Sequence, residues 1–313
     1  MNAALHVPLH PDRGERGLAL IIAMLVAALA ATVAISLASA QAQWSSQVAH
    51  RRDRVQAQSV ALAGVQWARQ ILDADDRATS IDHLSEPWAL PLPATPVENG
   101  SVEGRIVDAQ SMLNANNLAD ATNQTLERKR FERLFDALRL PPALLAAIVD
   151  WVDADDVPEP GGAEDAWYRS AAQPTLAPNM PALRPQELGG VRGMTASTLQ
   201  GLTRYVTTLP AYTPLNVNTA PAEVLAASIS NIEPGTFAAL IASRAGQPFA
   251  SAADFRERLP TGASIGGEAS YTVKSRYFLV SVRARQGDTL AQAHALIERG
   301  GTAWPRIVWQ TLE

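Results

Sequence analysis

The apolar residues of the chain change their spacing along its first quarter. Residues 18–40 form a stretch of 23 residues without a charge, enough to cross a bilayer as a helix, which takes roughly 20 residues. Beyond that stretch, apolar residues recur on one face at 100° per residue; they are Trp44, Val48, Val55, Leu62, Val65 and Leu72. The pattern predicts one helix over residues 18–73, about 80 Å long at 1.5 Å per residue, with an apolar first half and an amphipathic second half.

The rest of the chain alternates between loop, strand and helix patterns. Clustered prolines predict a loop over residues 74–100. Alternation of apolar and polar residues predicts four strands, at residues 101–108, 271–285, 290–298 and 305–312. Helical spacing covers residues 125–153, 194–208 and 220–258, with an irregular proline-rich segment at 154–185. This order predicts an α+β fold, in which a long helix precedes a sheet that a helical insertion of about 150 residues splits.

Three interpretations of the N-terminal segment compete. A secretory signal peptide has an apolar core of about 7–15 residues before a small-residue cleavage site, and Ala38-Ser39-Ala40 resembles such a site although this core is longer. A signal anchor is the second interpretation. The third starts from Arg16-Gly17-Leu18, because cleavage after that glycine leaves the apolar helix on the mature protein. The amphipathic continuation of the helix favours the third interpretation.

Composition and charge exclude several classes of function. The net charge of −5 argues against broad binding of nucleic acid, which requires a basic surface. The absence of cysteine excludes disulfides and a thiolate zinc site. The five histidines have no metal-ligand spacing, and the chain lacks a nucleophile elbow, a P-loop and a dinucleotide fingerprint. We therefore expect no enzymatic activity.

Several motifs together resemble one protein family. Arg16-Gly17-Leu18 before the apolar run is similar to the leader of type IV pilins and pseudopilins. Ile22 stands where most members have glutamate, a departure typical of the K-type minor pseudopilins of type II secretion systems. Further segments resemble the K type; they are Asn114-Ala115-Asn116-Asn117-Leu118, the acidic loop over residues 150–165, and Leu215-Asn216-Val217-Asn218-Thr219-Ala220-Pro221.

The resemblance implies a domain organisation. It implies a leader over residues 1–17, which prepilin peptidase removes between Gly17 and Leu18, and a spine helix over residues 18–73 with its membrane span at 18–40. It implies a pilin-like head from residues 74–118 and 270–313. The all-helical insertion at residues 119–269 would then hold SAM-like or helix-hairpin-helix-like subdomains.

The resemblance also implies a location, a function and partners. The location is the bacterial inner membrane, crossed once, with the bulk of the chain in the periplasm. The function is that of a minor pseudopilin at the pseudopilus tip, which helps to initiate assembly and the export of folded proteins across the outer membrane. Expected partners are the I-type and J-type minor pseudopilins in a heterotrimeric tip, other pseudopilins, and the secreted substrate or the outer-membrane secretin. We expect the contact with the smaller pseudopilins along the amphipathic helix, at Val48, Val55, Leu62 and Val65.

The acidic loop is the candidate ion site. Residues 150–165 contain seven carboxylates and no basic residue, so the cluster repels itself unless a cation or protons neutralise it. Calcium takes 6–8 oxygen ligands in a flexible geometry, and the resemblance to the K type also implies calcium in this region. A solvated loop without an ion is the alternative. The candidate ligands are Asp153, Asp155, Asp156, Glu164 and Asp165.

Residues 215–258 resemble a helix-hairpin-helix unit and supply the alternative function. Such units hold the nucleic-acid backbone through a glycine hairpin. Here the hairpin has Glu233 where a phosphate would approach, and the segment carries four acids against three bases. A membrane-anchored nucleic-acid-binding or DNA-uptake protein therefore remains the alternative, although phosphate binding is disfavoured.

Overall fold

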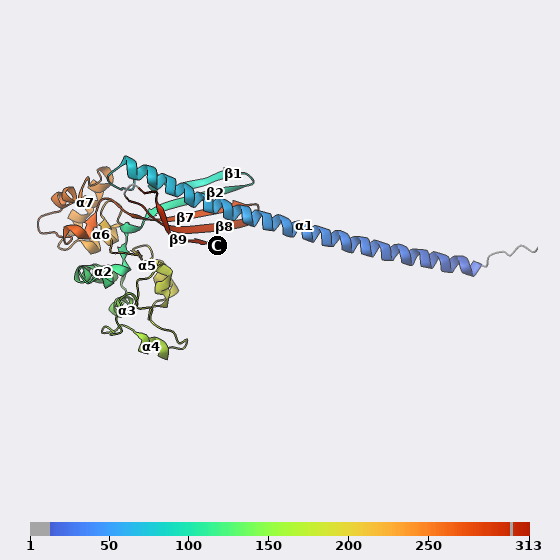
Figure 1. Cartoon of the computed structure of the whole chain (residues 1–313), viewed down its shortest axis with the longest axis horizontal. Coiled ribbons are helices and arrows are strands. Elements are labelled where there is room, and N and C mark those ends of the chain that lie inside the picture. Colours follow the sequence, from blue (N-terminus) through green and yellow to red (C-terminus); the bar gives the residue numbers. More distant parts are fainter. Residues whose placement is uncertain (1–12, 301–302) are drawn as a thin grey trace, which may run out of the picture.

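The computed structural model describes residues 13–300 and 303–313. Its longest element is helix α1 (Arg13–Ala78), of 66 residues, roughly 100 Å long at 1.5 Å per residue. The first half of α1 projects away from all other elements (Figure 1), and residues 17–52 are exposed throughout. The apolar span and the amphipathic segment therefore form one continuous helix, as predicted. This helix ends at Ala78, six residues after Leu72. Residues 1–12 of the expected leader lie outside the described residues.

The second half of α1 packs against one antiparallel sheet of five strands. In spatial order these are β1 (Leu92–Val97), β2 (Gly100–Asp108), β7 (Tyr277–Gln286), β8 (Thr289–Glu298) and β9 (Arg306–Leu312). Strand β2 pairs with β7 over nine residues, although the whole helical insertion separates them in sequence. The sheet and α1 form the two layers of a head (Figure 1).

Strand β1 corrects the prediction of a loop over residues 74–100. Its residues Pro93 and Pro96 lack the N–H that a central strand donates to its neighbours. Because β1 is at the edge of the sheet, only one of its sides must pair, and a bulge between Leu92 and Thr95 accommodates the irregular stretch. The proline content therefore marks an edge strand here.

The stripe of α1 that faces the sheet consists mainly of alanine. Its members are spaced by three or four residues and are fully or almost fully buried: Ala57, Ala61, Val65, Ala68 and Leu72. They pack in one core with alanines of the internal strand β8, so helix and sheet approach closely. A Cβ on Gly64 would lie 2.6 Å from a methyl of Val282. The core of the head thus begins at Ala57, and no side chain among residues 17–56 is buried.

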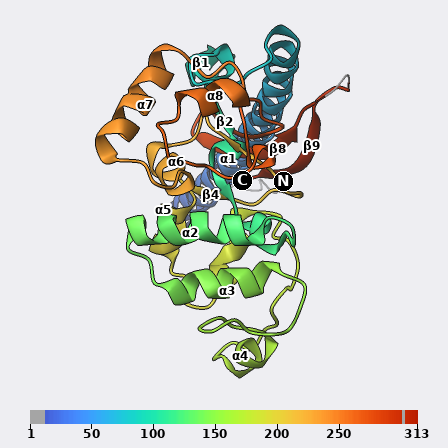
Figure 2. The same ribbon diagram turned by 90° about the vertical axis from the view of Figure 1, so that its left-hand side faces the viewer.

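The helical insertion has its own core and lies beside the end of the head that is distant from the apolar span (Figures 1 and 2). Its helices are α2 (Gln124–Leu138), α3 (Pro142–Val152), α4 (Asp165–Ser170), α5 (Ala196–Leu202), α6 (Ala222–Ser228), α7 (Pro234–Gly246) and α8 (Ala252–Arg258). Its core extends in sequence from Leu113 to Tyr271. Residues 113–118, assigned to the head on sequence, therefore pack with the insertion.

Two short parallel ladders close the insertion. Strand β3 (Leu113–Asn114) pairs with β4 (Val206–Thr207), and β5 (Leu215–Asn216) pairs with β6 (Tyr271–Thr272). The asparagine motif explains the first ladder, because the Asn114 side chain accepts a hydrogen bond from Leu209 N and donates to Ala211 O. Buried amides can replace backbone partners where the chain is irregular. The motif therefore has a structural role.

A buried carboxylate joins the head to the insertion. Asp108, at the end of β2, accepts hydrogen bonds from Asn216 Nδ2 at 3.0 Å, Thr219 Oγ1 at 2.5 Å and Ser275 Oγ at 2.6 Å. Burial raises the pKa of Asp108 to about 6, against the lowering effect of these donors. Asn216 and Thr219 belong to the motif at residues 215–221, so this motif fixes the insertion on the head.

Candidate functional site

Helix α1 has an exposed apolar stripe on the side of the predicted interface. Val48 and Val55 are 48% and 63% exposed, Trp44 is 68% exposed, and Leu62 is half-buried. Val65 is a correction, because it is fully buried against the sheet. At 100° per residue, Val65 lies with Leu72 on the alanine stripe, whereas Trp44, Val48, Val55 and Leu62 share a neighbouring face. We call these four residues the spine stripe.

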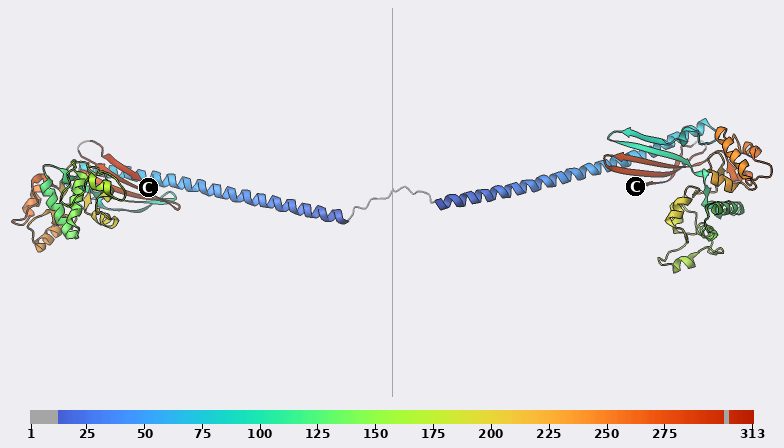
Figure 3. Two further views of the ribbon diagram at one scale, coloured as in Figure 1. Left: turned by 90° about the horizontal axis from the view of Figure 1, so that it is seen from below. Right: turned by 180° about the vertical axis from the view of Figure 1, so that it is seen from behind.

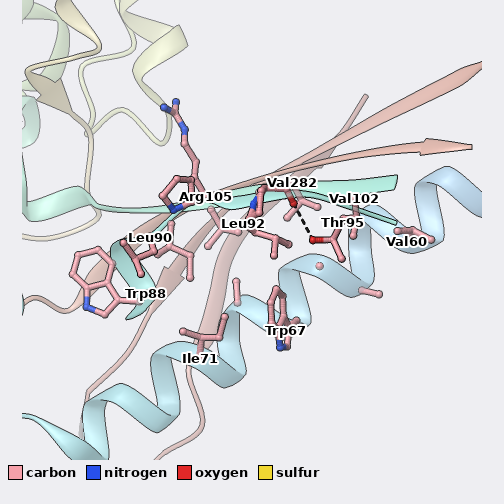
Figure 4. Close-up of a pocket in the computed structure, with 18 of the residues that line it drawn as sticks. Val60, Trp67, Ile71, Trp88, Leu90, Leu92, Thr95, Val102, Arg105 and Val282 are labelled. Atoms are coloured by element: carbon pink, nitrogen blue, oxygen red, sulfur yellow. Dashed lines mark hydrogen bonds between the residues drawn. The ribbon is translucent and has the colours of Figure 1, made fainter. Parts of the chain in front are cut away.

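An apolar groove lies on the other side of α1. It has a volume of about 760 Å³. Figure 4 shows Val60, Trp67 and Ile71 of α1 facing Leu92 and Val102 of the first two strands. Trp67 is 49% exposed and Leu90, at the rim, is 64% exposed. No sequence pattern predicted this groove, because its far wall is the proline-rich segment predicted as a loop.

The acidic loop gathers three of the five predicted ligands. Oxygens of Asp153, Asp155 and Glu164 lie within 4.8 Å of one another. Glu164 is only 3% exposed, and both of its carboxylate oxygens lack a hydrogen-bond partner, as does Asp153 Oδ1. Burial, reinforced by neighbouring acids, raises the pKa of Glu164 to about 7 and that of Asp153 to about 6. Bare buried carboxylates are costly without a cation or a proton.

Asn179 is a residue beside this group that the sequence analysis did not identify. Its Oδ1 is buried without a partner, while its Nδ2 donates to the carbonyl of Asp155 at 2.8 Å. Its backbone has a positive φ of 44°, which asparagine tolerates better than most residues. Asn179 lies 24 residues from Asp155 in a proline-rich segment. The only sequence signal is therefore a Pro-Asn pair that is typical of a turn.

Two predicted ligands do not join this group. Asp165 pairs with Arg169 at 2.5 Å and accepts a hydrogen bond from Ala177 N at 3.0 Å, so both its oxygens are engaged. Asp156 is exposed and lies outside the group of three. Helical spacing of four residues brings Arg169 to Asp165, which explains why this carboxylate is neutralised inside the chain.

The neighbouring carboxylates shape the loop. Asp150 accepts a hydrogen bond from Glu159 N at 3.1 Å, and Glu159 pairs with Arg128 of α2. A Cβ on Gly162 would lie 2.0 Å from an oxygen of Asp150, so only glycine permits this close approach. These contacts hold the loop between Asp153 and Glu164 in a closed turn.

A second acidic group already holds an internal cation. Asp75, Asp82 and Glu86 lie close together. Arg299 donates to Asp75 at 2.6 Å and to Asp82, and its guanidinium lies 4.4 Å from the ring centre of Phe278. An arginine side chain thus occupies the place that a metal ion would take in this group.

The basic residues of the helix-hairpin-helix-like segment are engaged within the protein. Arg244 donates to the carbonyls of Val217 and Ala220 at 2.9 and 2.8 Å. Arg258 pairs with Asp254 at 2.7 Å, and Arg256 pairs with Glu268. None of these three side chains is left to neutralise a phosphate.

The expected processing site lies on α1. Gly17 and Leu18 are both exposed, and a Cβ at Gly17 would meet nothing within 4 Å. The described part of the chain contains one helix that is long and apolar enough to cross a membrane, which fits a single-pass anchor.

Comparisons with known proteins agree with the resemblance. Two models of the family "Type II secretion system (T2SS), protein K" match residues 111–211 and 215–274. A type II secretion system protein K of Pseudomonas aeruginosa is 32% identical over 92% of this chain and 90% of its own length. The chain belongs to the type II secretion system protein K family. The K protein of Klebsiella pneumoniae is 28% identical over 92% of this chain and 93% of its own length.

The family assignment explains the fold. A crystal structure titled as the GspK-GspI-GspJ complex from enterotoxigenic Escherichia coli superposes with a TM-score of 0.73, at 22% identity, over 85% of this chain and 99% of that chain. This likeness confirms the α+β architecture, with the long helix, the sheet and the helical insertion. Both family models lie within the insertion and its two ladders. Membership identifies the chain as a minor pseudopilin of a type II secretion system.

Proposed function

We propose that this minor pseudopilin occupies the tip of the pseudopilus, with its head and insertion in the periplasm, and assembles there with I-type and J-type pseudopilins. The observation that carries the proposal is the pair of uncovered apolar surfaces on α1, the spine stripe and the groove. Large exposed apolar surfaces on a soluble head mark sites of association. The related complex named above contains one protein of each type.

The two surfaces suit two partners. They lie on opposite sides of the alanine stripe, so one neighbouring subunit cannot cover both. The spine stripe continues along α1 toward the apolar span. A partner anchored in the same membrane would therefore meet it with its own spine. The groove is concave and has the edge strand β1 as a wall, which suits side chains inserted from a second subunit.

The shape of the insertion and the isoleucine at position 22 both favour a position of this subunit at the tip of the pseudopilus. The insertion extends sideways beyond the sheet (Figure 3), where regular stacking of further subunits would meet it. A carboxylate buried in an apolar filament core is costly without a partner. A subunit with no neighbour above it has no use for such a charge, which accounts for isoleucine at position 22.

We expect mixtures of the soluble heads to form a complex that depends on the spine stripe. Val55→Glu combined with Leu62→Glu should weaken co-purification with the I-type and J-type heads at least about tenfold, because two charges would be desolvated in the contact. Size-exclusion chromatography measures this effect. Glu233→Ala on the insertion is the matched control and should leave the complex unchanged. If the control abolished the complex while the stripe variant assembled, the orientation would be reversed.

Processing between Gly17 and Leu18 is part of the proposal. The mature chain is expected to begin at Leu18, because the whole apolar helix must remain as the spine. Gly17→Ala should be processed better than a bulky replacement at this position, since the peptidase must accept the chain in extended form. Intact-mass measurement of the protein purified from membranes tests this expectation, and a chain that began after Ala40 would contradict it.

A calcium ion at the acidic loop completes the proposal. Asp153, Asp155, Glu164 and the Asn179 side-chain carbonyl would supply four oxygens from two loops. Carboxylate and amide oxygens in a flexible loop are the ligands that calcium prefers. The ion would supply positive charge to buried carboxylates that have no other partner, and it would join residues 153–164 to residue 179.

A further inference from the structure

Large apolar side chains are concentrated around the acidic loop. Beyond α1, ten such side chains are exposed in the described part of the chain, and half of them lie within 27 residues. Val157, Leu176, Met180 and Leu183 are 54–72% exposed, and Trp167 is 38% exposed. Val157, Leu176, Met180 and Leu183 lie in irregular segments, whereas Trp167 is in α4 and packs against Tyr168 and Arg192. Such a concentration marks an interaction surface.

Hydrogen bonds hold the two irregular segments together. Asn179 Nδ2 donates to Asp155 O at 2.8 Å, which brings Met180 beside the segment that carries Val157. Ala177 N donates to Asp165 at 3.0 Å, and Thr175 N donates to Tyr168 O at 3.2 Å. The exposed apolar residues are therefore neighbours of the candidate calcium ligands in space as well as in sequence.

We propose that these residues form a docking surface for a protein segment that presents apolar side chains among lysines or arginines. The charge of the surface selects this partner. The seven carboxylates of residues 150–165 and Glu187 face four arginines, Arg128, Arg169, Arg184 and Arg192. The acids therefore still outnumber the positive charges after one calcium ion binds. Opposite charges around an apolar contact steer association and choose the partner. Anionic membrane surfaces are repelled for the same reason.

The position of the surface separates it from the interfaces on α1. Helix α4 and the adjoining loops lie at the end of the insertion, away from the sheet and from α1 (Figure 2). A partner bound there would not compete with subunits on the spine stripe or in the groove. The insertion therefore offers a second binding activity, distinct from tip assembly.

Calcium would control this surface, an aspect that rests on the proposed calcium site. Without an ion, the repulsion among the carboxylates of Asp153, Asp155 and Glu164 opposes the hydrogen bonds that hold the two segments together. With an ion, the Asn179 carbonyl and the three carboxylates converge, so Val157 and Met180 are held in place. Docking is then preorganised and loses less conformational entropy.

Binding of a defined peptide tests the docking surface. The full chain is placed in phosphatidylcholine nanodiscs, and fluorescence anisotropy follows a labelled amphipathic peptide of leucine and lysine, with empty nanodiscs as the blank. We expect binding in calcium and a Kd at least about tenfold higher in EDTA. A peptide with glutamate in place of lysine should not bind.

A neutral triple variant identifies the surface. Val157→Asn, Met180→Gln and Leu183→Gln add no charge, and together they should raise the Kd about tenfold or more. The control Leu84→Gln with Leu290→Gln alters exposed apolar residues elsewhere and should not change it. Equal melting curves establish that both variants fold.

Three outcomes would contradict the proposal that these residues form a docking surface. They are equal peptide binding by the triple variant and the wild type, equal binding of the glutamate peptide, and binding to phosphatidylglycerol vesicles in place of the peptide. Calcium binding is measured separately on the same samples by calorimetry. If the peptide binds the surface equally well with and without calcium, the docking surface stands and its control by calcium is refuted.

Discussion

Calcium is expected to raise the melting temperature of the periplasmic part of this chain by about 5–10 °C. A ligand that binds only the folded state adds about 2.7 kcal/mol at 100 times its Kd, and about 1 kcal/mol corresponds to roughly 2–4 °C for a domain of this size. The effect should be large because Glu164 and Asp153 have buried oxygens without partners. Differential scanning calorimetry of residues 44–313, with calcium or with EDTA, measures it. This fragment retains the whole described core, which begins at Ala57.

Variants separate a calcium site from a general salt effect. Glu164→Gln should abolish the calcium-dependent rise, and it should stabilise the calcium-free chain, because a neutral amide replaces a buried charge. Asn179→Ala should weaken the rise, since it removes one ligand. Asp165→Asn is the control, because Arg169 engages that carboxylate, and it should keep the full rise. Identical melting curves of the wild type in calcium and EDTA would exclude the site.

Replacement of Arg299 should destabilise the head by about 3–5 kcal/mol, because it leaves buried carboxylates without their counter-charge. The Arg299 side chain is 1% exposed, and those of Asp82 and Asp75 are 0% and 8% exposed. Burial raises the pKa of both acids, against the lowering effect of Arg299. Urea unfolding of Arg299→Gln measures the loss.

A double variant distinguishes a lost counter-charge from lost packing. Arg299→Met with Asp82→Asn removes the main ion pair together and should recover part of the stability that Arg299→Met alone loses. The control Arg285→Gln, on the exposed face of β7, should change the free energy of unfolding by less than about 0.5 kcal/mol. If the double variant were as unstable as the sum of its parts, the pair would not be coupled.

The ion pairs of Arg299 with Asp75 and Asp82 attach the C-terminal end of α1 to the head. Asp75 is in the last turn of α1, Asp82 follows the helix, and Arg299 follows β8. The arginine also donates to Leu72 O at 3.3 Å. One buried side chain thus joins the end of the spine helix to the end of β8.

Local patterns of the sequence were sufficient for the elements whose identity depends on neighbours along the chain. The uncharged run at residues 18–40 and the periodic run after it specify one long helix. Alternation specifies β2, β8 and β9, and Gly287 with Asp288 forms the turn between β7 and β8. The strand predicted over residues 271–285 is divided, because residues 271–272 form β6, which pairs with β5, and β7 begins at Tyr277. The leader motif and the segments rich in asparagine and acid indicated the family, because these motifs are contiguous in sequence.

The tertiary structure decided which of these residues meet. β1 is a strand because it lies at a sheet edge that tolerates Pro93 and Pro96, and no local pattern shows an edge. Val65 is buried while Val55 is exposed because the sheet selects the alanine face of α1, where small side chains permit close packing. Asn179 contacts Asp155, 24 residues away in sequence, because the fold brings two loops together. Helical period and composition are local properties, whereas burial and ligand geometry depend on contacts between distant segments, which only the folded chain defines.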